Sequence, residues 1–237
     1  MPESSEKNIA VLIPAYDPDP SMAEMASRLK ELGFLVCIVN DGSSKGHEKI
    51  FASAEQNAVI LRHKKNMGKG FALKTGINYL KKHEPQLKGF VTADADGQHA
   101  IKDIQKVAEV LESFDGIVLG TRDLKNAPAR SMFGNDLSRI TYAIFTGKII
   151  SDNQTGLRGF SMHLCDWLLG IEGKYYEYEM SVLVRAAKEG VEISTVPIET
   201  IYHNGNAGTH FKPVLDTIRI QKSIIKNALF YRPQKKG

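Results

Sequence analysis

Short apolar runs alternate with stretches of helical spacing through the first half of the chain, and this alternation limits the fold more than any other feature. The apolar runs lie at 9–14, 34–39, 59–61, 89–93 and 116–119, and the helical stretches at 21–32, 70–80 and 101–111. Runs that are apolar throughout are typical of strands buried on both faces. The order therefore predicts an α/β protein with a mostly parallel central sheet and helices on both faces.

Composition excludes several classes of protein. The chain has 237 residues, 42% of them hydrophobic, and a net charge of +4, which does not indicate a nucleic-acid partner. Two cysteines, Cys37 and Cys165, argue against a disulfide framework and favour a reducing compartment. The first residues, MPESSEKN, lack a secretion signal, and no apolar run approaches the roughly 18 residues that span a bilayer. The sequence predicts a cytoplasmic protein.

Polar residues follow three of the expected strands directly. The segments are Pro14-Ala15-Tyr16, Asn40-Asp41 and Asp94-Ala95-Asp96. Ligands of open parallel sheets bind at the carboxyl ends of the strands, so these segments predict a binding site there. Asp94 and Asp96 would share one face of extended chain, where their charges repel unless a cation lies between them. A hard divalent ion would satisfy both carboxylates; a solvated turn is the alternative.

Six segments identify a family. They are VLIPAYDPD, IVNDGS, NMGKGFALKTGI, TADADGQH, LGTRD and DNQTGLRGF, in this order. Together they resemble glycosyltransferase family two, most closely the dolichyl- or polyprenyl-phosphate sugar (mannose or glucose) synthases. The resemblance implies a GT-A type nucleotide-sugar-binding fold over residues 1–211 and an inverting, metal-dependent hexosyltransferase. The donor would be a GDP- or UDP-linked sugar, which the sequence does not distinguish.

The resemblance also implies roles at the donor site. Pro14, Ala15 and Tyr16 would line the nucleotide base, and Asp41 would accept a hydrogen bond from it. Asp96 and Gln98 would ligate Mg²⁺ or Mn²⁺, with Asp94 at the ribose or at the metal site. Lys69 would approach the diphosphate at a helix amino terminus, or is a solvated lysine. His99 orients a neighbour or is structural.

The acceptor divides the remaining hypotheses. Arg122, and Arg130 in a polar loop, would hold the phosphate of a polyprenyl (dolichyl or undecaprenyl) acceptor, and Arg139 competes with Arg130 for this role. An acceptor with a hydroxyl group, such as a glycan or small molecule, would instead need a general base. Glu179 and Asp152 are the acidic candidates, although Asp152 also suits a turn. A nucleotide-binding relative without transfer activity is the third hypothesis.

Residues 212–237 predict a basic amphipathic helix or tail. Val214, Leu215, Ile218, Ile225 and Leu229 approximate a helical stripe, and the segment carries seven cations: Lys212, Arg219, Lys222, Lys226, Arg232, Lys235 and Lys236. It would either attach to the anionic cytoplasmic face of a membrane or pack on the core. With no anchor of its own, the chain is expected to contact a membrane peripherally, to use a membrane-protein partner, or to act on a soluble acceptor.

Overall fold

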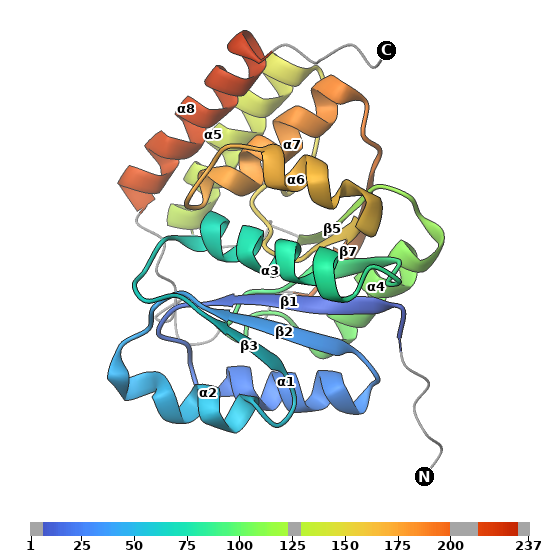
Figure 1. Ribbon diagram of the computed structural model, residues 1–237. Helices are drawn as coiled ribbons and strands as arrows, with labels where there is room; N and C mark the ends of the chain where they lie inside the picture. Colours follow the sequence, from blue (N-terminus) through green and yellow to red (C-terminus); the bar gives the residue numbers. More distant parts are fainter. Residues whose placement is uncertain (1–6, 123–128, 200–212, 232–237) are drawn as a thin grey trace.

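A seven-stranded sheet of order β3-β2-β1-β4-β6-β5-β7 forms the centre of the protein in the computed structural model, which describes residues 7–122, 129–199 and 213–231 (Figure 1). Its strands are β1 (Ile9–Ala15), β2 (Leu35–Asn40), β3 (Val59–Arg62), β4 (Gly89–Thr92), β5 (Ile117–Arg122), β6 (Arg158–Ser161) and β7 (Ile193–Ile198). Strand β6 runs antiparallel to β4 and β5, and all other pairs are parallel. The predicted mostly parallel sheet is confirmed.

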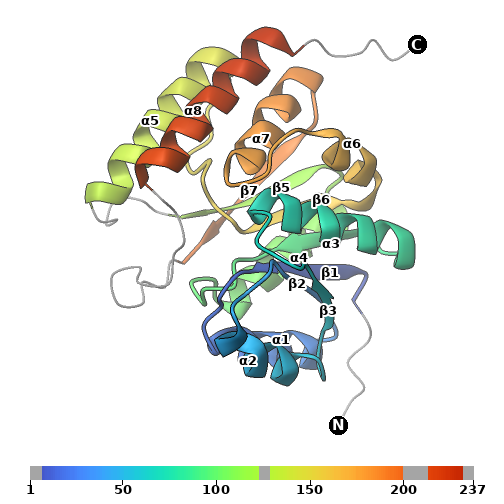
Figure 2. The ribbon, with the colours of Figure 1, turned by 60° about the vertical axis from the view of Figure 1, so that its left-hand side comes forward.

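Helices cover both faces of the sheet, as expected (Figures 1 and 2). Helices α1 (Ser21–Glu31), α2 (Glu48–Ala54) and α4 (Ile101–Ser113) lie on one face, and α3 (Lys69–His83), α6 (Cys165–Gly170) and α7 (Glu177–Glu189) on the other. Strand β1 serves both layers because its side chains alternate: Val11 and Ile13 belong to the first core, and Ala10 and Leu12 to the second.

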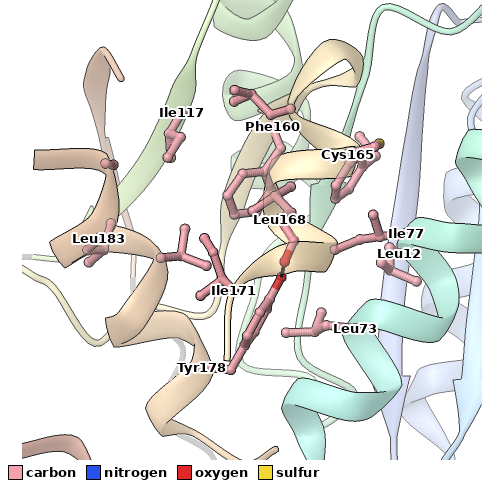
Figure 3. Close-up of a cluster of buried hydrophobic side chains, with 14 of the residues drawn as sticks. Leu12, Leu73, Ile77, Ile117, Phe160, Cys165, Leu168, Ile171, Tyr178 and Leu183 are labelled. Carbon is pink, nitrogen blue, oxygen red and sulfur yellow. Dashed lines mark hydrogen bonds between the residues drawn. The ribbon is translucent and has the colours of Figure 1, made fainter. Parts of the chain in front are cut away.

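The second core fixes the start of α7 (Figure 3). Tyr178 lies in this core with Leu12, Ile77 and Phe160, and its hydroxyl donates a hydrogen bond to the carbonyl of Leu168 at 3.0 Å. The phenol is buried with its polar group satisfied, so it holds the first turn of α7 in one position. The next residue in that turn is Glu179.

Two further helices, α5 (Ala129–Thr146) and α8 (Pro213–Phe230), lie side by side outside α7 (Figures 1 and 2). Ile220 and Ile224 of α8 are buried, and the hydroxyls of Ser223 and Ser181 are 2.6 Å apart. The described part of the C-terminal segment is therefore a helix packed on the core. Whether 212–237 is a unit separate from 1–211 stays a prediction.

Strand β1 extends one residue beyond the stop expected at Pro14. Its pairing with β4 ends at Leu12 and Thr92, whereas its pairing with β2 continues to Ala15 and Asn40. Pro14 thus lacks a neighbour on the β4 side, where its missing N–H would matter.

Candidate functional site

A cleft of about 840 Å³ opens at the carboxyl ends of β1, β2 and β4. It brings together seven of the residues predicted to bind donor or metal: Pro14, Ala15, Tyr16, Asp41, Lys69, Asp94 and Asp96. The prediction that these strand ends share one site is confirmed in its geometry. Gln98 is half-buried two residues beyond Asp96.

Asp17, which the sequence analysis gave no role, joins the first two loops of the cleft. Its carboxylate accepts a hydrogen bond from the Ser44 backbone N–H at 2.7 Å, and its own N–H donates to the Ser43 hydroxyl at 2.9 Å. Its φ is 44°, an unusual conformation for a residue other than glycine that aspartate tolerates better than most. Such strain persists where neighbouring contacts hold it, so Asp17 shapes this wall of the cleft.

Asp41 anchors the amino-terminal end of α3. Its buried carboxylate accepts hydrogen bonds from the backbone N–H groups of Met67 at 2.9 Å and Gly68 at 2.7 Å, and lies 2.6 Å from His63 Nδ1. Gly68 has φ +100°, and a Cβ there would lie 2.4 Å from the Lys174 carbonyl oxygen. A glycine is therefore required at this turn. The expected contact between Asp41 and a base stays a prediction.

Lys69 is the centre of a buried charge network and is not a solvated lysine. Its Nζ lies 2.7 Å from Asp94 Oδ1 and 2.8 Å from Glu179 Oε2, and its side chain is 14% exposed. Burial alone would lower the pKa of Lys69, but the two carboxylates outweigh it and hold that pKa above its usual value. The ring of Tyr176 lies 5.5 Å from the same nitrogen.

The two acids of the D-x-D pair have different surroundings. Asp94 has Lys69 on one oxygen and His99 Nε2 at 3.5 Å from the other. Burial opposes ionisation, but Lys69, with His99 beside it, holds the pKa of Asp94 below its usual value. Asp96 lines the cleft and accepts a hydrogen bond from the Gln98 N–H at 3.1 Å. Burial, with repulsion from Asp94, raises the pKa of Asp96. Asp96 is therefore the less compensated of the two carboxylates.

A metal ion in this cleft would need ligands beyond the carboxylates that the described residues place there. Within the described ranges, no group of three or more His, Cys, Asp or Glu side chains could hold a metal ion. Asp96 fits as a single carboxylate ligand open to the cleft, since Mg²⁺ often takes one or two carboxylates together with phosphate and water. Asp94, whose Oδ1 pairs with Lys69, is 30% exposed and lines the same cleft.

The segment 152–158 connects the two halves of the site. At one end Asp152 accepts two hydrogen bonds from the guanidinium of Arg122, at 2.7 and 3.0 Å, and its side chain is fully buried. At the other end Gly156 lies so close to Asp94 that a Cβ would be 2.1 Å from Asp94 Oδ2. The predicted residues Arg122 and Asp152 are thus brought together as an ion pair, and Asp152 also accepts from the Gln154 N–H at 3.3 Å, as its turn role predicted.

Arg158, also without a role in the sequence analysis, holds this segment from within. Its buried guanidinium donates to the carbonyl oxygens of Thr155 at 2.8 Å, Glu179 at 2.7 Å and Asn153 at 3.2 Å. It also lies 3.7 Å from the Glu179 carboxylate. The carboxylate of Glu179, predicted as a possible base, therefore lies between the cations Lys69 and Arg158.

The other arginines predicted for the acceptor lie on α5. Arg130 was expected in a polar loop, but its backbone is in this helix, because Phe133, Leu137 and Ile140 continue a helical apolar spacing; its side chain is outside the described residues. Arg139 pairs with Asp136 of the same helix at 3.1 Å.

Helix α8 supplies one wall of the cleft, which the sequence analysis did not foresee. Asp216 and Arg219 line it, and Arg219 Nη1 donates to Asp216 Oδ1 at 2.9 Å. The guanidinium of Arg219 lies 4.4 Å from the ring centre of Tyr175, another lining residue. The sequence grouped Arg219 with the basic tail because its one-dimensional pattern shows charge but not what the helix packs against.

Comparison with known proteins shows which family this chain resembles. Residues 10–167 match the family model described as Glycosyl transferase family 2. An uncharacterised protein of Methanocaldococcus jannaschii is 32% identical over 240 residues, covering 96% of this chain and 95% of its own. The UDP-N-acetylglucosamine–dolichyl-phosphate N-acetylglucosaminyltransferase of Methanococcus voltae is 32% identical, covering 84% of this chain and 87% of its own.

Solved structures show the same fold. The glucosyl-3-phosphoglycerate synthase of Mycobacterium tuberculosis, crystallised with Mn²⁺, UDP and phosphoglyceric acid, aligns with a TM-score of 0.72. The alignment covers 98% of this chain and 81% of that chain at 15% identity. The predicted GT-A type fold is confirmed by this likeness.

Proposed function

Because the chain belongs to glycosyltransferase family 2, we propose that it transfers a sugar from a GDP- or UDP-linked donor to a polyprenyl phosphate, with inversion at the anomeric carbon. The observation that carries this proposal is the cleft, which gathers Asp41, Lys69, Asp94 and Asp96 at three strand ends. The name of the Methanococcus voltae relative supports a lipid-phosphate acceptor. A site of action at the cytoplasmic face of a membrane goes with such an acceptor.

Asp96 and Gln98 would hold Mg²⁺ or Mn²⁺ in this cleft. When bound, the ion would neutralise charge on the donor diphosphate as it leaves. The presence of Mn²⁺ and UDP in a solved relative supports this assignment. Lys69 keeps Asp94 ionised and fixed beside the ligand position, so preorganised charge is ready before the donor binds.

Arg122 would bind the acceptor phosphate. Its side chain is 21% exposed, and the buried Asp152 holds its guanidinium in one orientation. A phosphate monoester has a second pKa of about 6, so it arrives as an anion and needs no base. Its oxygen forms the new bond to the anomeric carbon while the bond to the diphosphate breaks, and the nucleoside diphosphate leaves.

The chemistry of Glu179 disfavours a hydroxyl acceptor. A general base must reach the acceptor's proton. Glu179 pairs through Oε2 with Lys69 at 2.8 Å, its Oε1 lies 3.7 Å from Arg158, and its side chain is only 11% exposed. Transfer to an already anionic phosphate needs no general base, and therefore does not require Glu179.

The test is a transfer assay with a panel of GDP- and UDP-sugars and a short-chain, water-soluble polyprenyl phosphate, with Mg²⁺, Mn²⁺ or chelator. We expect a glycosyl phospholipid from one donor, and loss of product in chelator. Transfer to sugars or small alcohols, with none to the polyprenyl phosphate, would establish the hydroxyl alternative. Binding of nucleotide without any turnover would establish a relative without transfer activity.

A further inference from the structure

Exposed apolar side chains gather on two adjoining helices at one side of the protein (Figures 1 and 2). Helix α8 exposes Val214, Leu215, Ile218, Ile225, Leu229 and Phe230. Helix α5 and the turn after it expose Leu137, Ile140, Ile144 and Ile149. We call these ten side chains the α5–α8 face. Among the large apolar residues that are exposed in the described part of the chain, Tyr175 alone lies elsewhere.

Helix α8 is apolar on both of its sides. Its buried side carries Ile220 and Ile224, and on its outer side Leu229 is 59% and Phe230 76% exposed. In water the hydrophobic effect favours a polar outer side for such a helix. Helix α5 repeats this pattern, since Tyr142 is buried and Ile144 is 73% exposed. Two neighbouring helices with apolar outer sides form a patch of the kind that contacts another phase or protein.

The charges around the α5–α8 face favour a lipid surface over a protein. The other exposed residues of α8 at its described positions are Arg219, Lys222 and Lys226, and Lys148 follows α5. The exposed acids beside them are Asp136 on α5 and Glu172, which pairs with Lys226, so the cations remain in excess. Lysine is depleted at protein–protein interfaces. Lysines beside apolar side chains are typical of helices that lie in the headgroup region of anionic membranes, where their stems reach past the apolar layer.

The α5–α8 face adjoins the cleft through α8 itself. Asp216 and Arg219 line the cleft, while Leu215 and Ile218, next to them in the chain, point outward. Among the described residues no helix is long and apolar enough to cross a bilayer. We propose that the α5–α8 face docks on an anionic lipid bilayer, so that a lipid-borne phosphate enters the cleft past α8. The second clause rests on the proposed function; the docking itself does not.

The experiment is flotation of the full chain with vesicles of phosphatidylcholine, with and without phosphatidylglycerol. The face variant is Ile144→Glu/Ile218→Glu/Ile225→Glu. Its matched control, Ala52→Glu/Ser53→Glu/Gln56→Glu, adds the same three charges at exposed positions on or just after α2, on the opposite side of the molecule (Figure 1). We expect the wild type and the control to float with anionic vesicles. The face variant should bind vesicles at least about tenfold more weakly, because isoleucines that insert into the bilayer contribute most of the apolar attraction.

Salt separates the two components of binding. The Debye length falls from about 10 Å at 0.1 M to about 3 Å at 1 M, so attraction through lysines fades while apolar insertion persists. A Lys222→Glu/Lys226→Glu variant should therefore lose binding at low salt, whereas the wild type keeps a residual component at high salt. Equal flotation of wild type and face variant would overturn the proposal, as would no flotation of the wild type. A wild-type dimer in sedimentation velocity, monomeric in the face variant and indifferent to lipid, would make the face a contact between copies.

Transfer to the water-soluble acceptor distinguishes this inference from the proposed function. A face variant that retains this transfer but no longer floats supports docking as a property separate from chemistry. A wild type that floats but transfers no sugar would sink the proposed function and leave the docking in place.

Discussion

Gly156 sets the position of Asp94, and through it the charge network of the cleft. Replacing it with alanine would bring a Cβ to 2.1 Å from Asp94 Oδ2, so the carboxylate must shift, which disturbs its pair with Lys69. Displacement of a reacting constellation by about 1 Å costs up to roughly 10²-fold in rate, and we expect Gly156→Ala to lower turnover by at least about tenfold. Steady-state kinetics with the active donor measure it.

Gly170→Ala is the matched control, because a Cβ there has nothing within 4 Å. It should keep wild-type turnover. Wild-type turnover in Gly156→Ala as well would mean that the position of Asp94 does not matter for the reaction, and its proposed role would be wrong.

Asp96→Asn separates activity from stability. The substitution removes the carboxylate that faces the cleft, so turnover should fall by about 10²-fold or more if electrostatic preorganisation dominates. Because burial and Asp94 raise the pKa of Asp96, its ionised form costs folding free energy. The variant should therefore melt at the wild-type temperature or above, in a thermal unfolding scan near neutral pH.

Asp115→Asn, at a carboxylate 82% exposed, is the control for loss of one charge and should change neither quantity. Undiminished wild-type turnover in excess chelator would contradict the metal assignment, whatever the variant does.

At this scale the sequence predicted which residues meet, but not how they differ. The spacing of Asp94 and Asp96, and their place after a buried strand, placed both at the cleft. The opposite directions in which their pKa values shift depend on Lys69 and His99 reaching Asp94 from outside the D-x-D pair. No local pattern contains that information, because it arises from tertiary packing.

Among the elements, β6, α7 and the segment before β6 are joined by Arg158. Its three carbonyl acceptors lie on the 152–158 segment and in the first turn of α7, and lysine cannot reach all three with one ammonium group. Since buried donors and acceptors left unpaired cost about 1–3 kcal/mol each, Arg158→Lys should lower the free energy of unfolding by about 2–4 kcal/mol. Denaturant unfolding measures the change.

The control is Arg28→Lys on α1. It makes the same substitution at an exposed arginine, which pairs with Glu24. It should leave the unfolding midpoint unchanged. An Arg158→Lys variant as stable as this control would mean that the segment is held by other contacts.

The strands of the first half could be predicted because each is mainly an apolar run, and helices α1, α3 and α4 because each has an apolar face. The short helix α2 was not predicted. Strand β6, with the sequence RGFS, has no such run, and its reversed direction follows from its neighbours rather than from its residues. Strand β7 carries Pro197, which lowers strand propensity but is tolerated at the edge of the sheet. The stripe on α8 was found correctly, although that stripe faces outward while Ile220 and Ile224 face the core.

For the molecule as a whole, the two cysteines report on the integrity of the core. Burial raises the pKa of Cys37 to about 12 and that of Cys165 to about 11. At about pH 8 both thiols are thus neutral in the folded protein, and the thiolate is the reactive form. We expect negligible reaction of the native protein with a thiol reagent such as DTNB and release of two equivalents in denaturant.

A Cys165→Ser variant assigns any native reactivity to one site. Rapid reaction of Cys37 in that variant would show that β2 separates from its neighbours on the time scale of the assay, against the sheet described above.

The reversed strand has a consequence for recombination between related proteins. Strands β3, β2, β1 and β4 form one parallel block, β5 and β7 another, and β6 is the seam that pairs with both. Four residue pairs join β6 to the first block, and among them the rings of Phe90 and Phe160 lie 5.4 Å apart. A chimera with its crossover in the loop after α4 would exchange β5 and β7 together, with Arg122, the proposed acceptor residue. Such a chimera must match this seam, and also the contacts that Glu179 and α8 make at the cleft, because these come from the exchanged half.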